Sequence, residues 1–232
     1  MPIMKQKFCI PIIKSSQKEV LSVIAKNKSK YDYFEIWLDY IEDLDVKFVQ
    51  LLSKTHKENL IVLFRRQKLE TPTMDTSLKH AILKALEGSK TLVDFDIKTQ
   101  KKDVSHVASQ KLKLSLILSY HNYESTPTDT FLNTVLKEMN KYSPLIYKIS
   151  TFCKSDSDAI RLLSILVKLQ KEHKQSIILG MGEHGIYTRI CGMLLGNMFS
   201  FAPDTIADAS APGQLTRKEL QGISKILSRK FN

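Results

Sequence analysis

The stretch SPLIYKISTFC, residues 143–153, decides the fold, because it is a short apolar run that encloses one lysine. Its branched and aromatic residues favour the pleated, packed setting of a strand. Pro144 marks its beginning, and the polar run from Lys154 marks its end. The stretch therefore predicts a short buried strand with Lys148 near its C-terminal end.

Apolar runs of this kind recur eight times, each followed by a longer amphipathic segment. Eight strand–helix units in 232 residues predict an α/β fold, a (β/α)8 TIM barrel, formed as a single domain over residues 1–232. An open doubly wound sheet stays an alternative, because the fourth helix and the eighth strand have weak patterns. The expected strands span residues 8–13, 33–38, 60–64, 92–97, 114–120, 143–153, 176–181 and 197–202.

Local signals predict where several helices begin and end. Three capping boxes, in which a hydroxyl and a carboxylate three residues apart bond the first turn, each predict a helix start. Thr126 and Pro127 predict an N-cap and a first helical residue, and Gly88 predicts a helix end. The boxes are Ser16-x-x-Glu19, Ser155-x-x-Asp158 and Thr216-x-x-Glu219.

Composition narrows the class of protein. Hydrophobic residues make up 43% and charged residues 25%, as in ordinary globular proteins, and no apolar run reaches the ~18 residues of a membrane span. The three cysteines are odd in number and widely spaced, which favours reduced thiols and a cytoplasmic location. No spacing of Cys or His predicts a metal site.

The net charge of +11 is compatible with more than one class of binding partner. Nucleic acid is one, but the 35 basic residues are spread along the chain without an aromatic-basic motif. A solvated, lysine-rich surface is the favoured interpretation. A small anionic substrate is also compatible, because a positive field raises its local concentration.

Several polar residues fall near the C-terminal ends of the expected strands, where barrel enzymes carry their sites. A buried Lys148 should have a lowered pKa and become a nucleophile toward carbonyls, although a lone lysine more often extends to the solvent at the rim. His121, one strand away, could move protons, and the combination indicates carbonyl chemistry through a Schiff base. Each residue alone could equally be an ordinary surface residue. The other candidates are Glu35, Trp37, Arg65, Arg66, Glu70, Arg189 and the loop 210–214.

Four motifs, in matching order and spacing, resemble type I 3-dehydroquinate dehydratase over essentially the whole chain. They are SYHNYESTP (119–127), YKIS (147–150), GMGEHGIYTRICG (180–192) and ASAPGQ (209–214). The last of these is quite specific. The resemblance implies a (β/α)8 lyase that removes water from 3-dehydroquinate to give 3-dehydroshikimate.

The resemblance also implies residue roles. Lys148 would form the Schiff base with the C3 ketone, His121 would act as general base and acid, and Glu70 would orient and polarise the histidine. Arg189 would grip the substrate carboxylate. The remaining substrate contacts would be Glu35, Arg66, Ser210, Gln214, Met181 and Phe201, with Arg65 fitting only after a one-residue shift.

Two departures from the family pattern alter the expected site. The family has Glu-x-Arg on the second strand, where this chain has Glu35 and Trp37, so one cationic contact is missing or is replaced by Arg65. Thr71 and Pro72 follow Glu70 where the family has two glycines, and proline fixes φ. We expect an active enzyme, with a catalytically weakened relative as the alternative.

Two further alternatives remain open: another Schiff-base barrel such as an aldolase acting on a sugar phosphate, and a basic non-enzymatic barrel that binds nucleic acid or a protein partner. The first does not explain the SAPGQ motif, and the second does not explain the grouped polar residues. The resemblance implies a small-molecule substrate, no metal, no organic cofactor and a homodimer, while the sequence leaves open a biosynthetic or a catabolic role.

Overall fold

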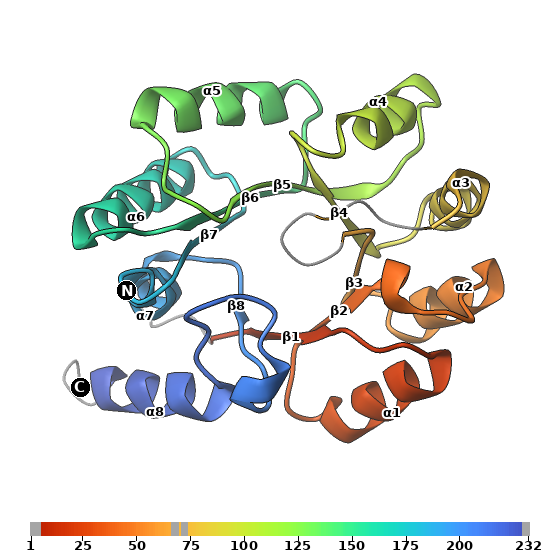
Figure 1. Cartoon of the computed structure of the whole chain (residues 1–232), viewed down its shortest axis with the longest axis horizontal. Helices are drawn as coiled ribbons and strands as arrows, with labels where there is room; N and C mark the ends of the chain where they lie inside the picture. Colours follow the sequence, from red (N-terminus) through yellow and green to blue (C-terminus); the bar gives the residue numbers. More distant parts are fainter. Residues whose placement is uncertain (1–5, 66–69, 71–73, 229–232) are drawn as a thin grey trace. The chain divides into compact units, whose positions relative to one another are not determined.

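The computed structural model describes residues 6–65, 70 and 74–228, in which strands and helices alternate (Figure 1). The strands are β1 (Phe8–Ile12), β2 (Tyr33–Trp37), β3 (Leu60–Leu63), β4 (Leu92–Asp96), β5 (Ser115–Asn122), β6 (Ile146–Phe152), β7 (Ser176–Met181) and β8 (Ser200–Phe201). The helices are α1 (Gln17–Asn27), α2 (Val46–Thr55), α3 (Thr76–Ala85), α4 (Lys101–Ser109), α5 (Asp129–Asn140), α6 (Asp156–Lys171), α7 (Ile186–Leu195) and α8 (Arg217–Ser228). Short 3-10 turns, η1 (Leu38–Tyr40) and η3 (Ile206–Asp208), follow β2 and β8.

The order of the strands in the sheet is β7-β6-β5-β4-β3-β2-β1-β8. The pairs β1–β8, β2–β3, β3–β4, β4–β5 and β6–β7 are all parallel. A first strand that pairs with the last, and helices between successive parallel strands, are features of the (β/α)8 barrel rather than of a doubly wound sheet. The expected fold class is confirmed.

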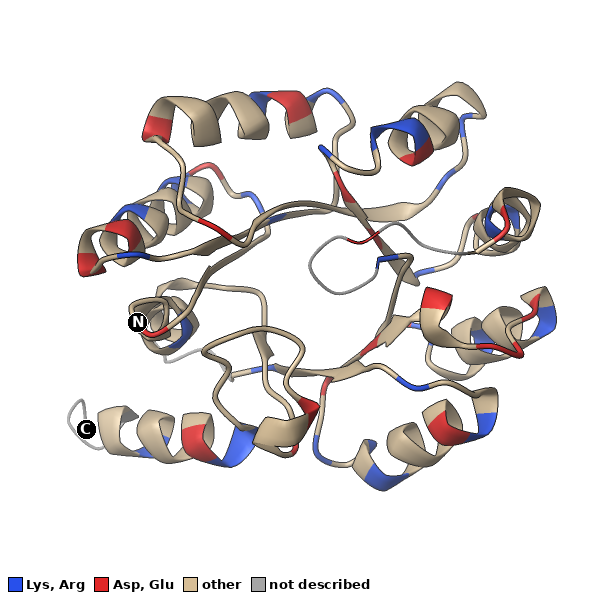
Figure 2. Ribbon diagram, in the orientation of Figure 1, with Lys and Arg blue, Asp and Glu red and all other residues tan. Residues whose placement is uncertain are grey.

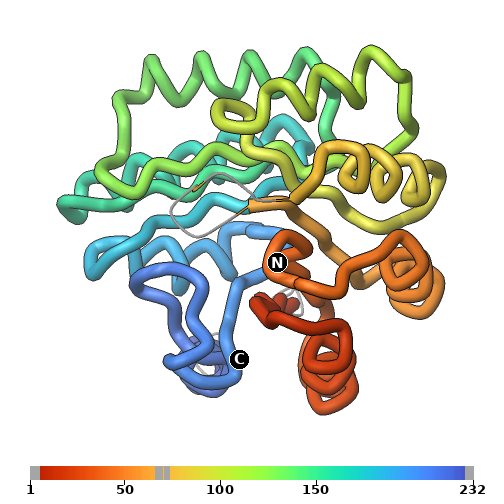
Figure 3. The backbone as a smooth tube through the Cα atoms, turned by 45° about the vertical axis from the view of Figure 1, so that its right-hand side comes forward, coloured from red at the N-terminus to blue at the C-terminus, as the bar shows by residue number. Residues whose placement is uncertain are grey.

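The chain divides into two compact units. The first comprises Met1–Pro11, Tyr120–Lys137 and Ile146–Asn232, and the second comprises Ile12–Ser119 and Glu138–Leu145. The first unit contains β6, β7 and β8 with helices α6, α7 and α8. In it, the chain passes from β8 through η3 to α8 (blue in Figure 3). The second unit contains β2, β3 and β4 with helices α1 to α4.

The apolar runs locate every strand, and 176–181 matches β7 at both ends. The eighth strand is much shorter than the expected 197–202, and a side chain explains why. Asn197 accepts a hydrogen bond from the backbone N–H of Ile178 (2.8 Å) and donates one to its carbonyl (3.0 Å). The amide of Asn197 thus takes the backbone partners on β7 that a longer β8 would have used.

Two of the three capping boxes are confirmed. Ser16 is the N-cap of α1 and its side chain accepts a hydrogen bond from the N–H of Glu19. At α8, Glu219 Oε2 accepts from the N–H of Thr216 (2.7 Å), and Thr216 Oγ1 accepts from the N–H of Glu219 (3.3 Å). Gly88, with φ of +73°, follows α3 as the stop signal predicted.

The other helix starts differ from the prediction. Ser155 is the N-cap of α6 but makes no side-chain cap, and Asp158 instead accepts a hydrogen bond from the N–H of Lys154. Helix α5 begins at Asp129, not at Pro127, and Thr128 Oγ1 accepts from the N–H of Phe131. Thr126 does not cap, because its hydroxyl bonds β6, as described below.

Lys and Arg residues lie mostly on helices and connecting segments (Figure 2). Among the strands of the described residues, only Lys148 is a lysine or arginine. The three cysteines are free thiols, with Cys9 and Cys153 buried. Within the described chain, no helix has the length and apolar character needed to cross a membrane.

Candidate active site

Lys148 is buried inside β6, with 4% of its surface exposed. Its ammonium nitrogen lies 4.4 Å from the centroid of the Phe201 ring, so the charge faces an aromatic surface. The expected place near the end of the strand is wrong, because β6 continues for four residues beyond Lys148, to Phe152. The lysine does not extend to the rim; its amine is held within the sheet.

Apolar residues of β7 and β8 lie beside the lysine. In the parallel register, Lys148 pairs with Ile177 and Phe152 pairs with Met181. Alternate residues of a strand point to one face, so Lys148 and Phe152 share a face with these partners. Met181 is fully buried and Phe201 is 4% exposed. Both are apolar core residues, and their role as a wall toward a substrate stays a prediction.

His121 is the penultimate residue of β5 and is half-buried. Its ring stacks on Tyr123, with centroids 6.3 Å apart and planes 18° from parallel. The loop that follows is tied to the lysine strand, since Thr126 Oγ1 lies 2.9 Å from Thr151 Oγ1 and donates to the carbonyl of Phe152 (3.0 Å). The histidine is therefore at the start of a fixed segment, not of a loose loop.

Arg189 is buried in the first turn of α7, with 3% exposed. Burial lowers the pKa of its guanidinium to about 10, which still leaves it charged at neutral pH. One terminal nitrogen donates to the carbonyl of Pro212 at 3.4 Å, whereas the buried Nε has no hydrogen-bond partner among the described residues. No carboxylate of the described chain forms an ion pair with it. A buried, incompletely bonded cation of this kind is suited to bind an anion.

The loop carrying Ser210 and Gln214 is closed on itself. Gln214 Oε1 accepts from the N–H of Ser210 (2.9 Å), and Gln214 Nε2 donates to Ser210 Oγ (3.0 Å). The carbonyl of Pro212 also accepts from the N–H of Gly182 at 3.3 Å. The loop thus packs on the turn between β7 and α7, next to the arginine.

Two glycines permit this close packing. Gly213 has a φ of +76°, and a Cβ added there would lie 2.5 Å from the carbonyl oxygen of Gly182. Such a distance is far below van der Waals contact, and few side chains tolerate a positive φ. Glycine at 213 is therefore required for the loop to approach Gly182.

In the second unit, Glu35 is 2% exposed in β2. Trp37 donates its indole N–H to Glu35 Oε1 at 3.0 Å and is itself buried. Glu35 therefore accepts a hydrogen bond from a neutral indole N–H, whereas the family pattern has an arginine at position 37. Glu70 is exposed. Arg66, Thr71 and Pro72 lie outside the described residues.

Arg65 has a place that the sequence alone did not reveal. Its terminal nitrogen donates to Asp94 Oδ1 and to Ser119 Oγ, both at 2.9 Å, and all three side chains are buried. Its backbone N–H donates to Asp39 Oδ1. A guanidinium committed to a buried carboxylate is a poor substitute for a substrate-binding cation, which favours a missing contact over a replaced one.

Comparison with known proteins identifies the chain. A sequence model described as Type I 3-dehydroquinase matches residues 8–230. The chain belongs to the type I 3-dehydroquinase family. Members are hydro-lyases, and the chain is accordingly an enzyme of that class. No three or more His, Cys, Asp or Glu side chains within the described residues form a group that could hold a metal ion.

Individual relatives of this type I 3-dehydroquinase agree along nearly their whole length. A 3-dehydroquinate dehydratase from Coxiella burnetii (strain RSA 493 / Nine Mile phase I) is 28% identical over 220 residues, which is 93% of this chain and 91% of that protein. One from Methanococcus maripaludis (strain C7 / ATCC BAA-1331) is 30% identical over 230 residues, which is 94% of this chain and 99% of that protein. The solved 3-dehydroquinate dehydratase from Geobacillus kaustophilus HTA426 superposes with a TM-score of 0.80 at 20% identity, covering 97% of this chain and 92% of that one.

The sequence did not single out three groups that form this part of the type I 3-dehydroquinase. Asp94 lies in the expected strand 92–97 and Ser119 opens the motif 119–127, and the sequence assigns neither a role, although a buried Asp in an apolar run is itself a signal of a buried cation nearby. The carbonyl of Pro212 carries no side-chain signal at all. It could be found only from the coordinates.

Proposed function

We propose that the chain is a 3-dehydroquinate dehydratase that converts 3-dehydroquinate to 3-dehydroshikimate through a Schiff base on Lys148. The observation that carries the proposal is the lysine itself. It is buried in β6 against Phe201, and within the described strands no other lysine or arginine occurs. A buried lysine amine among apolar residues is suited to attack a carbonyl carbon.

The reaction proceeds in balanced steps. The amine of Lys148 attacks the C3 ketone, and the carbinolamine loses water to give an iminium ion. His121 removes a C2 proton, and the electrons pass to the iminium nitrogen as an enamine forms. The enamine then expels the C1 hydroxyl, which leaves as water with the proton returned by His121. Water hydrolyses the iminium to release the enone and the free lysine.

Arg189 holds the carboxylate of the substrate in this proposal. Its charge, its burial and its lack of a carboxylate partner among the described residues support the role. Ser210 and Gln214, on the loop that bonds Arg189 through Pro212, supply polar contacts, while Met181 and Phe201 supply apolar ones. We assign the remaining roles from the family motifs alone: Glu35 and Arg66 to the substrate and Glu70 to the orientation of His121. We assign the activity to residues 1–232 as one catalytic domain, without metal or organic cofactor.

Loss of the amine tests the proposal. Lys148→Met keeps the apolar stem and should lower kcat by about 10⁴-fold or more, because both the nucleophile and the electron sink disappear. Turnover is followed by the enone absorbance of the product. Lys174→Met is the matched control, since this lysine also lies over an aromatic ring, that of Tyr147, at 5.4 Å. Equal activity of wild type and Lys148→Met would refute the Schiff base.

We also propose that the enzyme is a cytoplasmic homodimer. Free cysteines suit a reducing compartment. Helix α7 exposes Tyr187, Leu194 and Leu195 and carries no charged residue apart from the buried Arg189, so two copies can meet there despite a net charge of +11 each. Light scattering should give about twice the chain mass of 26.6 kDa, and Leu194→Glu should halve it. Leu51→Glu, on an exposed part of α2, is the control.

A further inference from the structure

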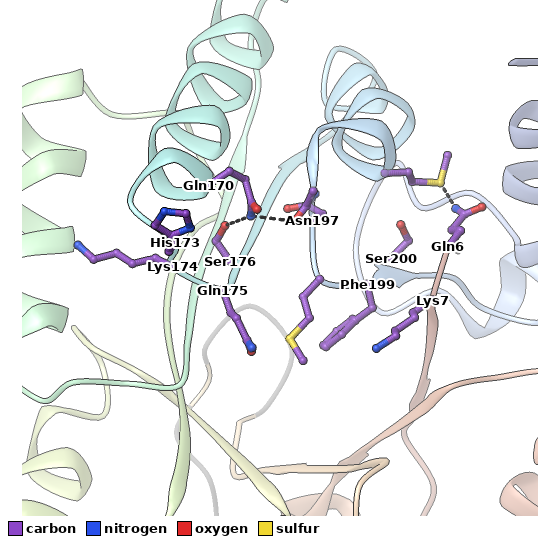
Figure 4. A pocket seen from close by; sticks show the side chains of 13 residues that line it. Gln6, Lys7, Gln170, His173, Lys174, Gln175, Ser176, Asn197, Phe199 and Ser200 are labelled. Atoms are coloured by element: carbon purple, nitrogen blue, oxygen red, sulfur yellow. Dashed lines mark hydrogen bonds between the residues drawn. The ribbon is translucent and has the colours of Figure 1, made fainter. Parts of the chain in front are cut away.

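A cavity of about 570 Å³ lies in the first unit, between β7 and β8 (Figure 4). Strand β8 pairs with β1 through Ser200 and Phe201, while the backbone of Ile178 on β7 bonds the amide of Asn197 instead of a strand. The cavity opens next to the Asn197 side chain. It is lined by residues that precede the strands and by residues at the ends of α6 and α7. Its volume is in the range of small-molecule pockets.

The cavity has a cationic side and an apolar side. Lys7 and Lys174 line it, and among its described lining residues there is no Asp or Glu. Met193 and Met198, both half-buried, provide apolar surface, and Gln6 Nε2 donates to the Met193 sulfur (Figure 4). Phe199 also lines the cavity, but its ring is buried, with 1% exposed. The lining therefore matches a ligand with an anionic group and an apolar body.

The two lysines differ in what they already bind. Lys174 forms an ion pair with Glu172 at 2.7 Å and lies over the ring of Tyr147. Lys7 is exposed and forms no ion pair with any described residue, while its carbonyl accepts from the N–H of Ser200 (3.0 Å) and fixes its backbone. Lys7 is the cation left for a ligand.

The carbonyl groups at the helix ends do not oppose an anion, although a helix C-terminus carries partial negative charge. Gln170 Nε2 donates to the carbonyl of Gly196 at 2.8 Å, and the N–H of Asn197 donates to that of Gly192 at 2.8 Å. At the end of α6, the N–H of Lys174 donates to the carbonyl of Leu169 at 2.9 Å. These three acceptors are hydrogen-bonded, which reduces the partial negative charge that they present, and Lys7 supplies the full positive charge.

We propose that this cavity binds a small carboxylate with an apolar ring, its carboxylate on Lys7 and its ring against Met193 and Met198. The site lies among the residues before the strands and does not include Lys148 or Arg189. The proposal does not rest on the proposed reaction, although the ring of Phe199 packs edge-on against that of Phe201, with centroids 5.4 Å apart. A single unpaired lysine beside thioether groups suits a ring-bearing carboxylate better than a phosphate, which needs several charged donors.

Methionine methyl groups report directly on the cavity. In the full chain labelled with ¹³C-methyl methionine, benzoate should shift the signals of Met193 and Met198 and leave that of Met139, which is buried in α5, unchanged. The signals are assigned with Met193→Leu and Met198→Leu. Met181 marks the region of the catalytic lysine, so binding there is seen separately.

Substitutions separate charge from packing. Lys7→Gln should raise the Kd of benzoate about tenfold, because one charge-assisted hydrogen bond is lost. Lys171→Gln, which removes an exposed charge at the end of α6 outside the cavity lining, should not change it. Cyclohexylammonium, a ring with the opposite charge, should not bind. Shifts confined to Met181, an unchanged Kd in Lys7→Gln, or equal binding of the cation would each overturn the proposal.

Discussion

Arg65 and Arg189 are equally buried, each 3% exposed, yet they have opposite surroundings. Arg65 meets a carboxylate and a hydroxyl, Asp94 and Ser119, both at 2.9 Å. Arg189 meets one backbone carbonyl, at 3.4 Å, and no carboxylate of the described residues. The Nε of both arginines is buried without a hydrogen-bond partner among the described residues, so the carboxylate is what distinguishes them.

The difference separates a cation that the fold already pairs from the cation that we propose binds the substrate. A buried charge is costly unless it is paired, so the pairing of Arg65 stabilises the fold. The incomplete bonding of Arg189 is a cost that a bound carboxylate can offset. The contrast also explains why an arginine motif in the sequence does not by itself identify a ligand contact.

The largest effect is expected at Asp94. Asp94→Ala leaves the Arg65 charge buried without its carboxylate and should lower the free energy of unfolding by about 3–5 kcal/mol. Arg189→Met, which removes a cation that has no carboxylate, should cost far less or stabilise the fold. Urea unfolding of both variants measures the difference. A similar loss in the two would break the comparison.

Arg189→Gln should raise KM for 3-dehydroquinate about 100-fold, because the charge that binds the carboxylate is lost. Arg161→Gln is the matched control, since Arg161 on α6 pairs with Asp129 and Asp158. Its KM should stay near that of wild type. An unchanged KM in Arg189→Gln would remove this residue from the binding site.

The loop that bonds Arg189 offers a smaller test. Gly213→Ala introduces a Cβ 2.5 Å from the Gly182 carbonyl and should displace Ser210 and Gln214, raising KM about tenfold. Gly222→Ala in α8 has no atom within 4 Å of the added Cβ and should leave KM unchanged. Hydrogen exchange of residues 209–214 should rise only in the first variant. Equal KM values in both would mean that the loop position does not matter.

The smallest effect concerns the neutral donor in β2. Trp37→Phe keeps an aromatic ring but removes the N–H that bonds Glu35, at an expected cost of about 1–2 kcal/mol in unfolding free energy. Trp37→Arg restores the family pattern and should lower KM. Thermal unfolding and steady-state kinetics check the two expectations, and a KM unaffected by Trp37→Arg would retire the missing-contact hypothesis.

The sequence predicted the fold well because its signals are local. Apolar runs located every strand, and the boxes at Ser16 and Thr216 located two helix starts. The errors arose where a side chain bonds a distant segment. Thr126 has the pattern of a cap but bonds β6, and Asn197 replaces backbone partners that would have lengthened β8.

For the site, residue types and motifs single out Lys148 and Arg189 as candidates, but they do not distinguish the surroundings of Arg189 from those of Arg65. That distinction depends on Asp94 and Ser119, which are 29 and 54 residues from Arg65 in the chain. Pairing at such separation leaves no pattern in a single sequence. The aromatic ring that faces the Lys148 amine is likewise that of Phe201, and β8 brings it to β6 only in the folded chain.

Reductive trapping tests the central claim most directly. The protein is incubated with 3-dehydroquinate and borohydride, digested, and examined by peptide mass spectrometry. The account predicts one covalent adduct, on the peptide that contains Lys148, formed in wild type and absent from Lys148→Met. An active enzyme that yields no adduct, or an adduct on another lysine, would contradict it.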